Sequence, residues 1–261
     1  MRFLVLLMLS TTAYTAELIA VYDLSAHNIP DPSGIMYDSN EFIIVDSEVN
    51  ETPLFSGVNV FRFNSKMELI ESMYASYTDE PTGVSFDGDG ACYISDDSGP
   101  KRIYKVDSGQ DGECFTSDDV VSEMRTLAYD IPDPEGVFFG NGALIIAGGT
   151  DQKVTIIRDE VHSDLVLAGM TDVEGVALRN GTIYAVGSPR EYVFKYDEFG
   201  QELGSIFLGL GIRKPSGVTF APSTDGSLGV SMFVTARGVD NNYDPDENDG
   251  KIYEYKLDGC E

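Results

Sequence analysis

Five short phrases of one pattern recur along the chain: DPSGI (31–35), EPTGV (80–84), DPEGV (133–137), DVEGV (172–176) and KPSGV (214–218). Their glycines are about 40 to 50 residues apart, which is the length of four short strands with their turns. A repeat of this length is typical of a β-propeller blade. The repeats therefore predict an all-β ring.

The residues after each phrase support this interpretation. An apolar strand begins at the glycine, a polar or glycine-rich turn follows, and a β-branched and aromatic run comes next, as in Phe42 to Val45 after the first phrase. A third run alternates polar and apolar residues, which is typical of an antiparallel strand. Glycine at the start of the innermost strand suits a position where backbones crowd the axis.

The ends of the chain predict how the ring closes. The chain supplies three strands after the fifth glycine, and the segment Leu18 to Leu24 precedes the first repeat unassigned. That segment completes the last blade as its outer strand and removes an open edge. We therefore expect five blades of four antiparallel strands. Six blades is the alternative, because residues 107–130 are long enough to contain an extra hairpin.

The first 16 residues are predicted to be a secretion signal. Arg2 precedes the apolar run Phe3 to Leu9, and small residues follow, with cleavage expected after Ala13 or Ala16. Residues 17–261 then form a single propeller domain. The apolar run is too short to span a bilayer, so we expect a monomeric protein that is secreted or periplasmic. The three cysteines, Cys92, Cys114 and Cys260, leave their pairing open.

The charge of the chain excludes some partners. Lys and Arg number 17 against 44 Asp and Glu, a formal net charge of −27. Nucleic acids and anionic membrane surfaces are repelled by such a surface. The expected partners are a protein, a glycan or a small molecule, and the dense carboxylates favour calcium as the cofactor.

Two acidic loops are candidate calcium sites. Alternating oxygen ligands in a looping chain, followed by glycine, are suited to a hard cation. Neither loop matches an EF-hand, and a solvated acidic turn is the alternative. The candidate ligands are Asp107, Asp111, Asp118 and Asp119 in the first loop, and Asp240, Asn242, Asp244, Asp246 and Asp249 in the second.

A second set of candidates belongs to the repeats themselves. Glu135 and Glu174 stand one residue before their glycines in neighbouring repeats, so a ring places them close together at one end of the channel. Two close carboxylates share a cation or a basic partner, or raise each other's pKa. The candidate ligand pocket consists of Asp46, Asp96, Glu135, Glu174 and Arg237. Strand capping is the alternative role for these residues.

Several longer motifs resemble a known family. They are the segment Val45 to Glu51, EPTG, ISDD, the loop Asp111 to Val121, DPEGV, and the segment Ala236 to Glu254. Together they resemble secreted bacterial NHL-like, SdiA-regulated-like β-propeller domains, which are often found beside calcium-binding repeats. The resemblance implies a propeller and calcium, and it implies no established reaction. This chain departs from a full ring of channel carboxylates, since Gly148, Gly187 and Ala236 stand where Asp46 and Asp96 stand in the first two blades.

Two classes of function fit these residues. The first is a calcium-binding recognition module with its ligand site at the central channel. The second is a metal-dependent hydrolase, lactonase- or phosphoesterase-like, with a divalent ion at the channel mouth. The sequence favours the binding module over the enzyme. It commits no residue to catalysis, and Glu135 and Glu174 are the candidates if the protein is an enzyme.

Overall fold

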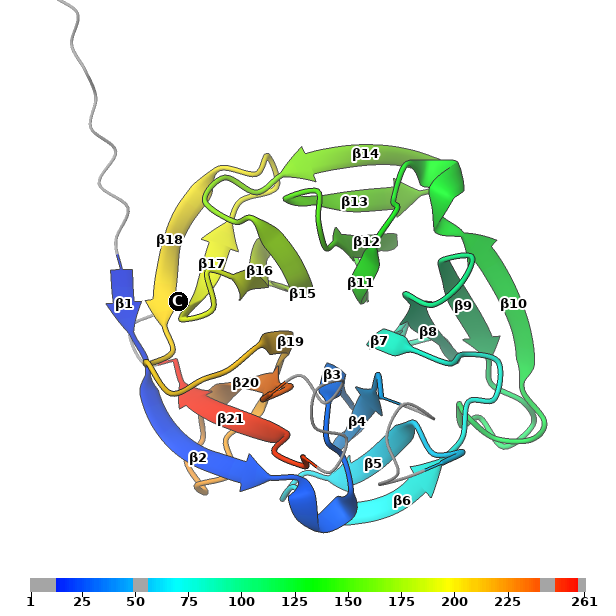
Figure 1. Ribbon diagram of the computed structural model, residues 1–261, viewed down its shortest axis with the longest axis horizontal. Coiled ribbons are helices and arrows are strands. Elements are labelled where there is room, and N and C mark those ends of the chain that lie inside the picture. Colours follow the sequence, from blue (N-terminus) through cyan, green and yellow to red (C-terminus); the bar gives the residue numbers. More distant parts are fainter. Residues whose placement is uncertain (1–12, 49–55, 240–246, 258–261) are drawn as a thin grey trace, which may run out of the picture.

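The computed structural model describes residues 13–48, 56–239 and 247–257. Five sheets stand around a common axis (Figure 1), and each contains four antiparallel blade strands, which are consecutive in the sequence in blades 1 to 4. The prediction of a five-bladed propeller is confirmed. Residues 107–130 contain no extra hairpin. Beyond Asp107, which ends β9, they supply one strand, β10, which is the outer strand of blade 2.

Each blade runs from an inner strand at the axis to an outer strand at the rim. Blades 1 and 2 contain β3 (Pro32–Asp38), β4 (Glu41–Asp46), β5 (Val60–Asn64), β6 (Leu69–Met73), β7 (Pro81–Phe86), β8 (Ala91–Asp96), β9 (Arg102–Asp107) and β10 (Val120–Arg125). Blades 3 and 4 contain β11 (Pro134–Gly140), β12 (Ala143–Gly148), β13 (Lys153–Arg158), β14 (Val161–Val166), β15 (Asp172–Arg179), β16 (Thr182–Ser188), β17 (Tyr192–Tyr196) and β18 (Glu202–Phe207). Blade 5 contains β19 (Pro215–Pro222), β20 (Val230–Ala236), β21 (Lys251–Lys256) and β2 (Glu17–Asp23). Two short 3-10 turns cover Ser25–His27 and Thr126–Tyr129.

The ring closes as the sequence predicts. β2, near the start of the chain, pairs antiparallel with β21, near its end, and so becomes the outer strand of blade 5. The two strands lie side by side in Figure 1. Because this pairing joins the two ends of the chain, blade 5 has four strands like the others and the outer edge of β21 is covered.

The five repeat glycines meet around the axis. A Cβ on Gly34 would lie 2.7 Å from the Cα of Gly83, and a Cβ on Gly83 would lie 2.8 Å from the Cα of Gly136. Similar close approaches continue around the ring through Gly175 and Gly217. Real Cβ atoms do not tolerate such distances, so only glycine allows the inner strands to approach this closely.

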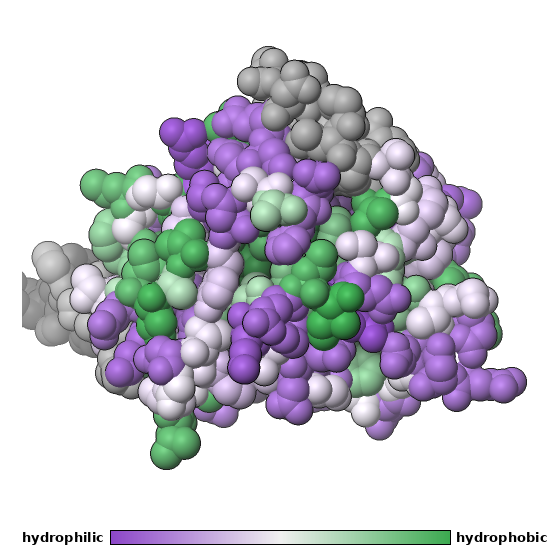
Figure 2. Space-filling model, turned by 90° about the horizontal axis from the view of Figure 1, so that it is seen from below, coloured by the Kyte–Doolittle hydropathy of each residue, from purple (hydrophilic) through white to green (hydrophobic). Residues whose placement is uncertain are grey.

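Hydrophobic side chains fill the seams between blades. Five buried clusters lie at the five seams, each with residues from two neighbouring sheets. Phe42 of blade 1 against Phe233 of blade 5, with ring centroids 4.7 Å apart, is one such contact. Figure 2 shows separate hydrophobic patches among hydrophilic side chains on one side of the ring. Leu18 and Ile70, on outer strands, are exposed hydrophobic residues.

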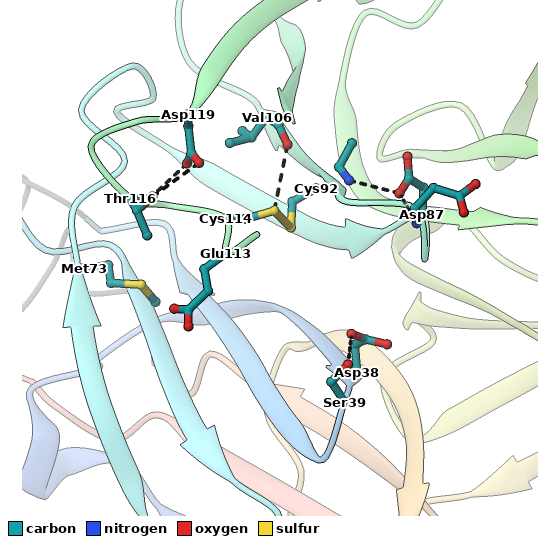
Figure 3. Close-up of a disulfide and its surroundings, with 12 residues drawn as sticks. Asp38, Ser39, Met73, Asp87, Cys92, Val106, Glu113, Cys114, Thr116 and Asp119 are labelled. Atoms are coloured by element: carbon teal, nitrogen blue, oxygen red, sulfur yellow. Dashed lines mark hydrogen bonds between the residues drawn. A yellow bond between two sulfur atoms is a disulfide. The ribbon is translucent and has the colours of Figure 1, made fainter. Parts of the chain in front are cut away.

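A disulfide fastens the first acidic loop to blade 2. Cys92 in β8 is bonded to Cys114 in the loop between β9 and β10 (Figure 3). The pairing that the sequence left open is therefore settled for these two cysteines, and Cys260 lies outside the described residues. A disulfide is consistent with an extracytoplasmic location.

A short extra strand lies outside blade 4. β1 (Ala13–Thr15) pairs parallel with β18. These residues fall within the predicted signal peptide: cleavage after Ala16 removes β1, whereas cleavage after Ala13 keeps Tyr14 and Thr15. The signal peptide itself stays a prediction. Among the described residues, no helix has the length and apolar composition needed to cross a bilayer.

The crowding at the axis predicts the cost of one added methyl group. Gly34→Ala should destabilise the fold by about 1–3 kcal/mol, because a tightly packed neighbour must move to admit the Cβ. The check is denaturant unfolding followed by circular dichroism. Gly211→Ala is the matched control, since no atom lies within 4 Å of a Cβ there. Equal stability of Gly34→Ala and the parent would contradict the axial packing.

Candidate binding site at the entry face

The candidate site lies where the five inner strands begin, which we call the entry face. At this end, the residue before each repeat glycine takes part in the contact between blades. The Ser33 hydroxyl donates to the carbonyl oxygen of Pro81 at 2.7 Å, Thr82 donates to that of Pro134 at 3.0 Å, and Ser216 donates to that of Pro32 at 2.8 Å. Three of the five seams are therefore joined by a hydroxyl.

Glutamates take this position in the other two blades. Glu135 in β11 and Glu174 in β15 make no equivalent bond to the next blade among the described residues. Each inner strand has a β-bulge at this end, which turns the side chains beside the glycine. The ring thus carries two carboxyl groups at positions where it elsewhere uses small donors.

The pKa values of both glutamates are raised. Burial, followed by the negative charge of Glu174, raises the pKa of Glu135 well above its usual value. Burial also raises the pKa of Glu174 to about 7, with Arg237 opposing the shift and Asp172 adding to it. Near neutral pH the pair therefore holds protons that ordinary glutamates have lost.

Arg237 is the cation that faces this pair. It follows β20, and its Nε and Nη2 atoms donate to Asp31 Oδ2, both at 3.1 Å. Its Nη1 lies 3.9 Å from Glu174 Oε2. Burial alone disfavours the charged guanidinium, but Asp31, Glu174 and Glu135 outweigh it and hold the pKa of Arg237 above its usual range.

Asp46 joins the site through Asp31. It is fully buried at the end of β4 and accepts from the backbone N–H groups of Asp31 and Glu48, both at 2.9 Å. Burial and the charge of Asp31 raise the pKa of Asp46 to about 7. Asp46 thus orders the turn that presents Asp31 to Arg237.

Asp96 lies at the equivalent end of β8 and has a local role. It accepts from the backbone N–H of Ser98 at 2.8 Å and from the Ser98 hydroxyl at 2.6 Å. The structure gives it no hydrogen bond to Glu135, Glu174 or Arg237. Its contacts are those of a turn-capping aspartate.

Sequence reasoning missed a group of carboxylates beside Glu135. Oxygen atoms of Asp97, Asp133 and Glu135 lie within 4.8 Å of one another, close enough to hold a metal ion. Lys101 bonds to Asp97 and lies 3.9 Å from Asp133. Burial raises the pKa of Asp97 to about 6, with Lys101 opposing and Asp133 adding. The signal was available, since Asp133 opens the phrase DPEGV and Asp97 follows Asp96.

A pocket of about 170 Å³ opens beside Glu174. It lies between blades 4 and 5, and Gly187 forms part of its wall at the position that Asp46 occupies in blade 1. A Cβ on Gly187 would lie 2.2 Å from the carbonyl oxygen of Asp172, so the backbone there admits only glycine. The charged lining of the pocket consists of Asp172, Glu174, Arg190, Lys214 and Arg237.

The carboxylates of the first acidic loop bond to neighbouring groups of blade 2. In the first loop, Asp118 accepts from the backbone N–H of Gln110, and Asp119 accepts from that of Thr116 (Figure 3). Asp111 accepts from the N–H of Glu113, and Asp107 pairs with Lys105. Within the described part of the chain, these carboxylates do not form a metal-sized group.

In the second loop, Asp240, Asn242, Asp244 and Asp246 lie outside the described residues. Asp249 is described, and it accepts from the N–H of Val239 at 3.1 Å. The calcium prediction for this loop stays a prediction.

Comparison with known proteins identifies similar folds. No protein-family model matches the sequence, and no curated protein matches it either. Among solved structures, glutaminyl cyclase of Myxococcus xanthus is similar over 95% of this chain and 98% of its own, with TM-score 0.63 and 14% identity. Virginiamycin B lyase of Staphylococcus aureus is similar over 93% and 99%, with TM-score 0.51 and 11% identity. A chain of the nidogen–laminin complex is similar over 72% and 67%, with TM-score 0.51 and 14% identity. At these identities the likeness shows the fold alone.

The raised pKa values predict that the glutamate pair lowers the free energy of unfolding by an amount that depends on pH. A carboxyl group whose pKa is higher in the folded state binds more protons there, so stability falls as pH rises from about 4.5 to about 7. The double variant Glu135→Gln/Glu174→Gln avoids this loss. The difference in free energy of unfolding between the double variant and the parent should rise in favour of the variant by about 3 kcal/mol from pH 4.5 to pH 7.5, since one pKa unit is worth about 1.4 kcal/mol.

The measurement is urea unfolding at a series of pH values without added divalent ions. Glu198→Gln, at an exposed position, is the matched control, and its stability relative to the parent should not change over this range. If the stability difference between the double variant and the parent also stayed constant over this pH range, the two carboxyl groups would have ordinary pKa values.

Proposed function

We propose that this protein is a secreted binding module that recognises a positively charged group at the entry face. The observation that carries the proposal is the replacement of Ser or Thr by Glu135 and Glu174 at two of five equivalent positions. A hydroxyl there joins two blades, whereas a glutamate loses that bond and adds a half-buried carboxyl group. Such a cost is expected at binding sites rather than in scaffolds.

The charge around the pair favours a cation. The carboxyl groups of Asp97, Asp133, Glu135, Asp172 and Glu174 gather at one end of the axis, and the bases near them are fewer: Lys101, Arg190, Lys214 and Arg237. A bound cation takes the place of the protons that the pair otherwise retains. Calcium or the ammonium group of an organic ligand meets this requirement, because both are attracted by carboxylate oxygens.

The wider setting supports a role outside the cytoplasm. The disulfide, the predicted signal peptide and the acidic surface agree with an exported protein that meets calcium. From the sequence motifs that resemble them, we further propose that the protein is related to the SdiA-regulated-like propellers. Its partner is then a small molecule, a glycan or a protein, and neither nucleic acid nor lipid.

A metal-dependent hydrolase is the second candidate, and Asp97, Asp133 and Glu135 favour it. Their hard oxygen atoms suit a calcium or magnesium ion, although Lys101 must give way to it. Such an ion polarises a carbonyl or phosphoryl oxygen, and Glu174, with its pKa near 7, is suited to hold or release a proton. Two similar structures are a cyclase and a lyase by name, which is a further reason to test for catalysis.

The binding proposal predicts a cation site that depends on both glutamates. In calorimetric titrations at pH 7.5, the parent protein should bind calcium or pentylamine, and Glu135→Gln/Glu174→Gln should lose one site for that cation. Neutral amides keep the size of the side chains and remove the attraction.

Glu198→Gln removes one exposed charge and should bind as the parent does. Two results would refute the proposal. One is the absence of binding of both cations by the parent. The other is equal binding by parent and double variant, which would move the site elsewhere, for example to the acidic loops.

The hydrolase candidate predicts metal-dependent turnover. Chelator-treated protein should regain hydrolysis of lactones or phosphate esters when calcium, magnesium or manganese is restored. Asp133→Asn should abolish this gain, because it removes one of three charged ligands. Asp111→Asn, in the loop outside this group, is the control. If no turnover is observed with any of these ions, the hydrolase candidate is wrong and the binding module is the remaining function.

A further inference from the structure

The entry face separates its charges into two halves. In blades 2 and 3, the three carboxyl groups of Asp97, Asp133 and Glu135 lie together, and Lys101 pairs with the first two. In the pocket between blades 4 and 5, three bases line the wall together with two carboxyl groups, Asp172 and Glu174. Glu174 belongs to both halves, because its charge acts on Glu135 and its side chain lines the pocket.

The bases of the pocket are held in different ways. Arg237 is fixed by Asp31 and lies 3.9 Å from Glu174. Lys214 lies just before β19, and its positive charge acts on Glu174. Arg190 follows β16 at an exposed position, where its charge acts on Asp172. A group entering the pocket therefore meets bases from two blades.

Two small residues form part of the pocket wall. Gly187 and Ser188 end β16, and Gly187 stands at the position filled by Asp46 in blade 1 and by Asp96 in blade 2. A Cβ on Gly187 would meet the carbonyl oxygen of Asp172, so this position holds glycine in blade 4. It therefore adds no carboxyl group to the pocket, and the three bases exceed the two carboxyl groups of Asp172 and Glu174.

We propose that the entry face binds a zwitterion, a ligand that carries a primary ammonium group and a carboxylate. The ammonium group lies against Glu135 and Glu174, and the carboxylate enters the pocket toward Arg190 and Lys214. This proposal rests on the proposed function, because it takes the cation at the glutamate pair to be part of a larger molecule. Two opposite charges held on one frame bind more tightly than either alone, since the second contact is intramolecular.

The test compares three ligand series by calorimetry at pH 7.5 and low salt. The probes are ω-amino acids from glycine to 6-aminohexanoate, the corresponding alkylamines, and the corresponding carboxylates. At least one amino acid should bind 10-fold or more tightly than the amine and the carboxylate of the same length. The length that binds best reports the separation of the two charges.

Variants assign the two ends of the ligand. Arg190→Gln and Lys214→Gln should each lower the affinity for that amino acid more than the affinity for the matching amine. Glu135→Gln/Glu174→Gln should abolish the binding of both. Arg125→Gln, which removes an exposed arginine of the rim, is the control and should bind as the parent does.

The outcomes separate the two proposals. If amines bind and no amino acid exceeds them, the zwitterion proposal is wrong and the cation site stands. If neither amines nor amino acids bind and calcium does, the ligand is the metal and the zwitterion proposal is again wrong. If nothing binds, both proposals fall. A preference for amino acids that survives Arg190→Gln and Lys214→Gln would overturn the placement of the carboxylate.

Discussion

The close approach of five backbones at the axis is the constraint on which this structure depends. Each repeat glycine faces the inner strand of the next blade at a distance that excludes a Cβ. Because the glycines fix how far each inner strand lies from its neighbours, they also fix where the residues beside them lie. The preceding residue in each repeat stands next to the backbone of the next blade. Small differences at that one position therefore decide how two blades meet.

That position explains why two glutamates have a large effect. In blades 1, 2 and 5 the residue is Ser33, Thr82 or Ser216, and it closes the seam with a hydrogen bond to a carbonyl oxygen. In blades 3 and 4 it is a glutamate that the same geometry half-buries near a second glutamate. The scaffold gains nothing evident from this exchange, since removing a carboxylate from water costs free energy unless it is paired. The account of function given above is that a ligand supplies the pairing.

The sequence was sufficient for the fold because the fold is repetitive. Glycine spacing, turn residues and alternation predicted five blades, and the unassigned segment Leu18 to Leu24 predicted the closure by β2. It also predicted the neighbourhood of Glu135, Glu174 and Arg237, since these residues have fixed places in the repeat. It did not predict Asp31, Asp97, Asp133 or Lys101, whose positions depend on how loops from different blades meet. The pairing of Cys92 with Cys114 was likewise not predicted, because it depends on how close the two residues lie in the folded chain.

The most direct test of this account is a pH titration of the side-chain carboxyl carbons of Glu135 and Glu174 by NMR, assigned with the single Gln variants. The account predicts two coupled transitions, with at least one pKa near 7 or above and both moving down when calcium or an amine is added. Two independent transitions near the ordinary glutamate value of about 4.3, unaffected by either cation, would contradict it. The glutamates would then be solvated side chains, and the entry face would hold no cation site.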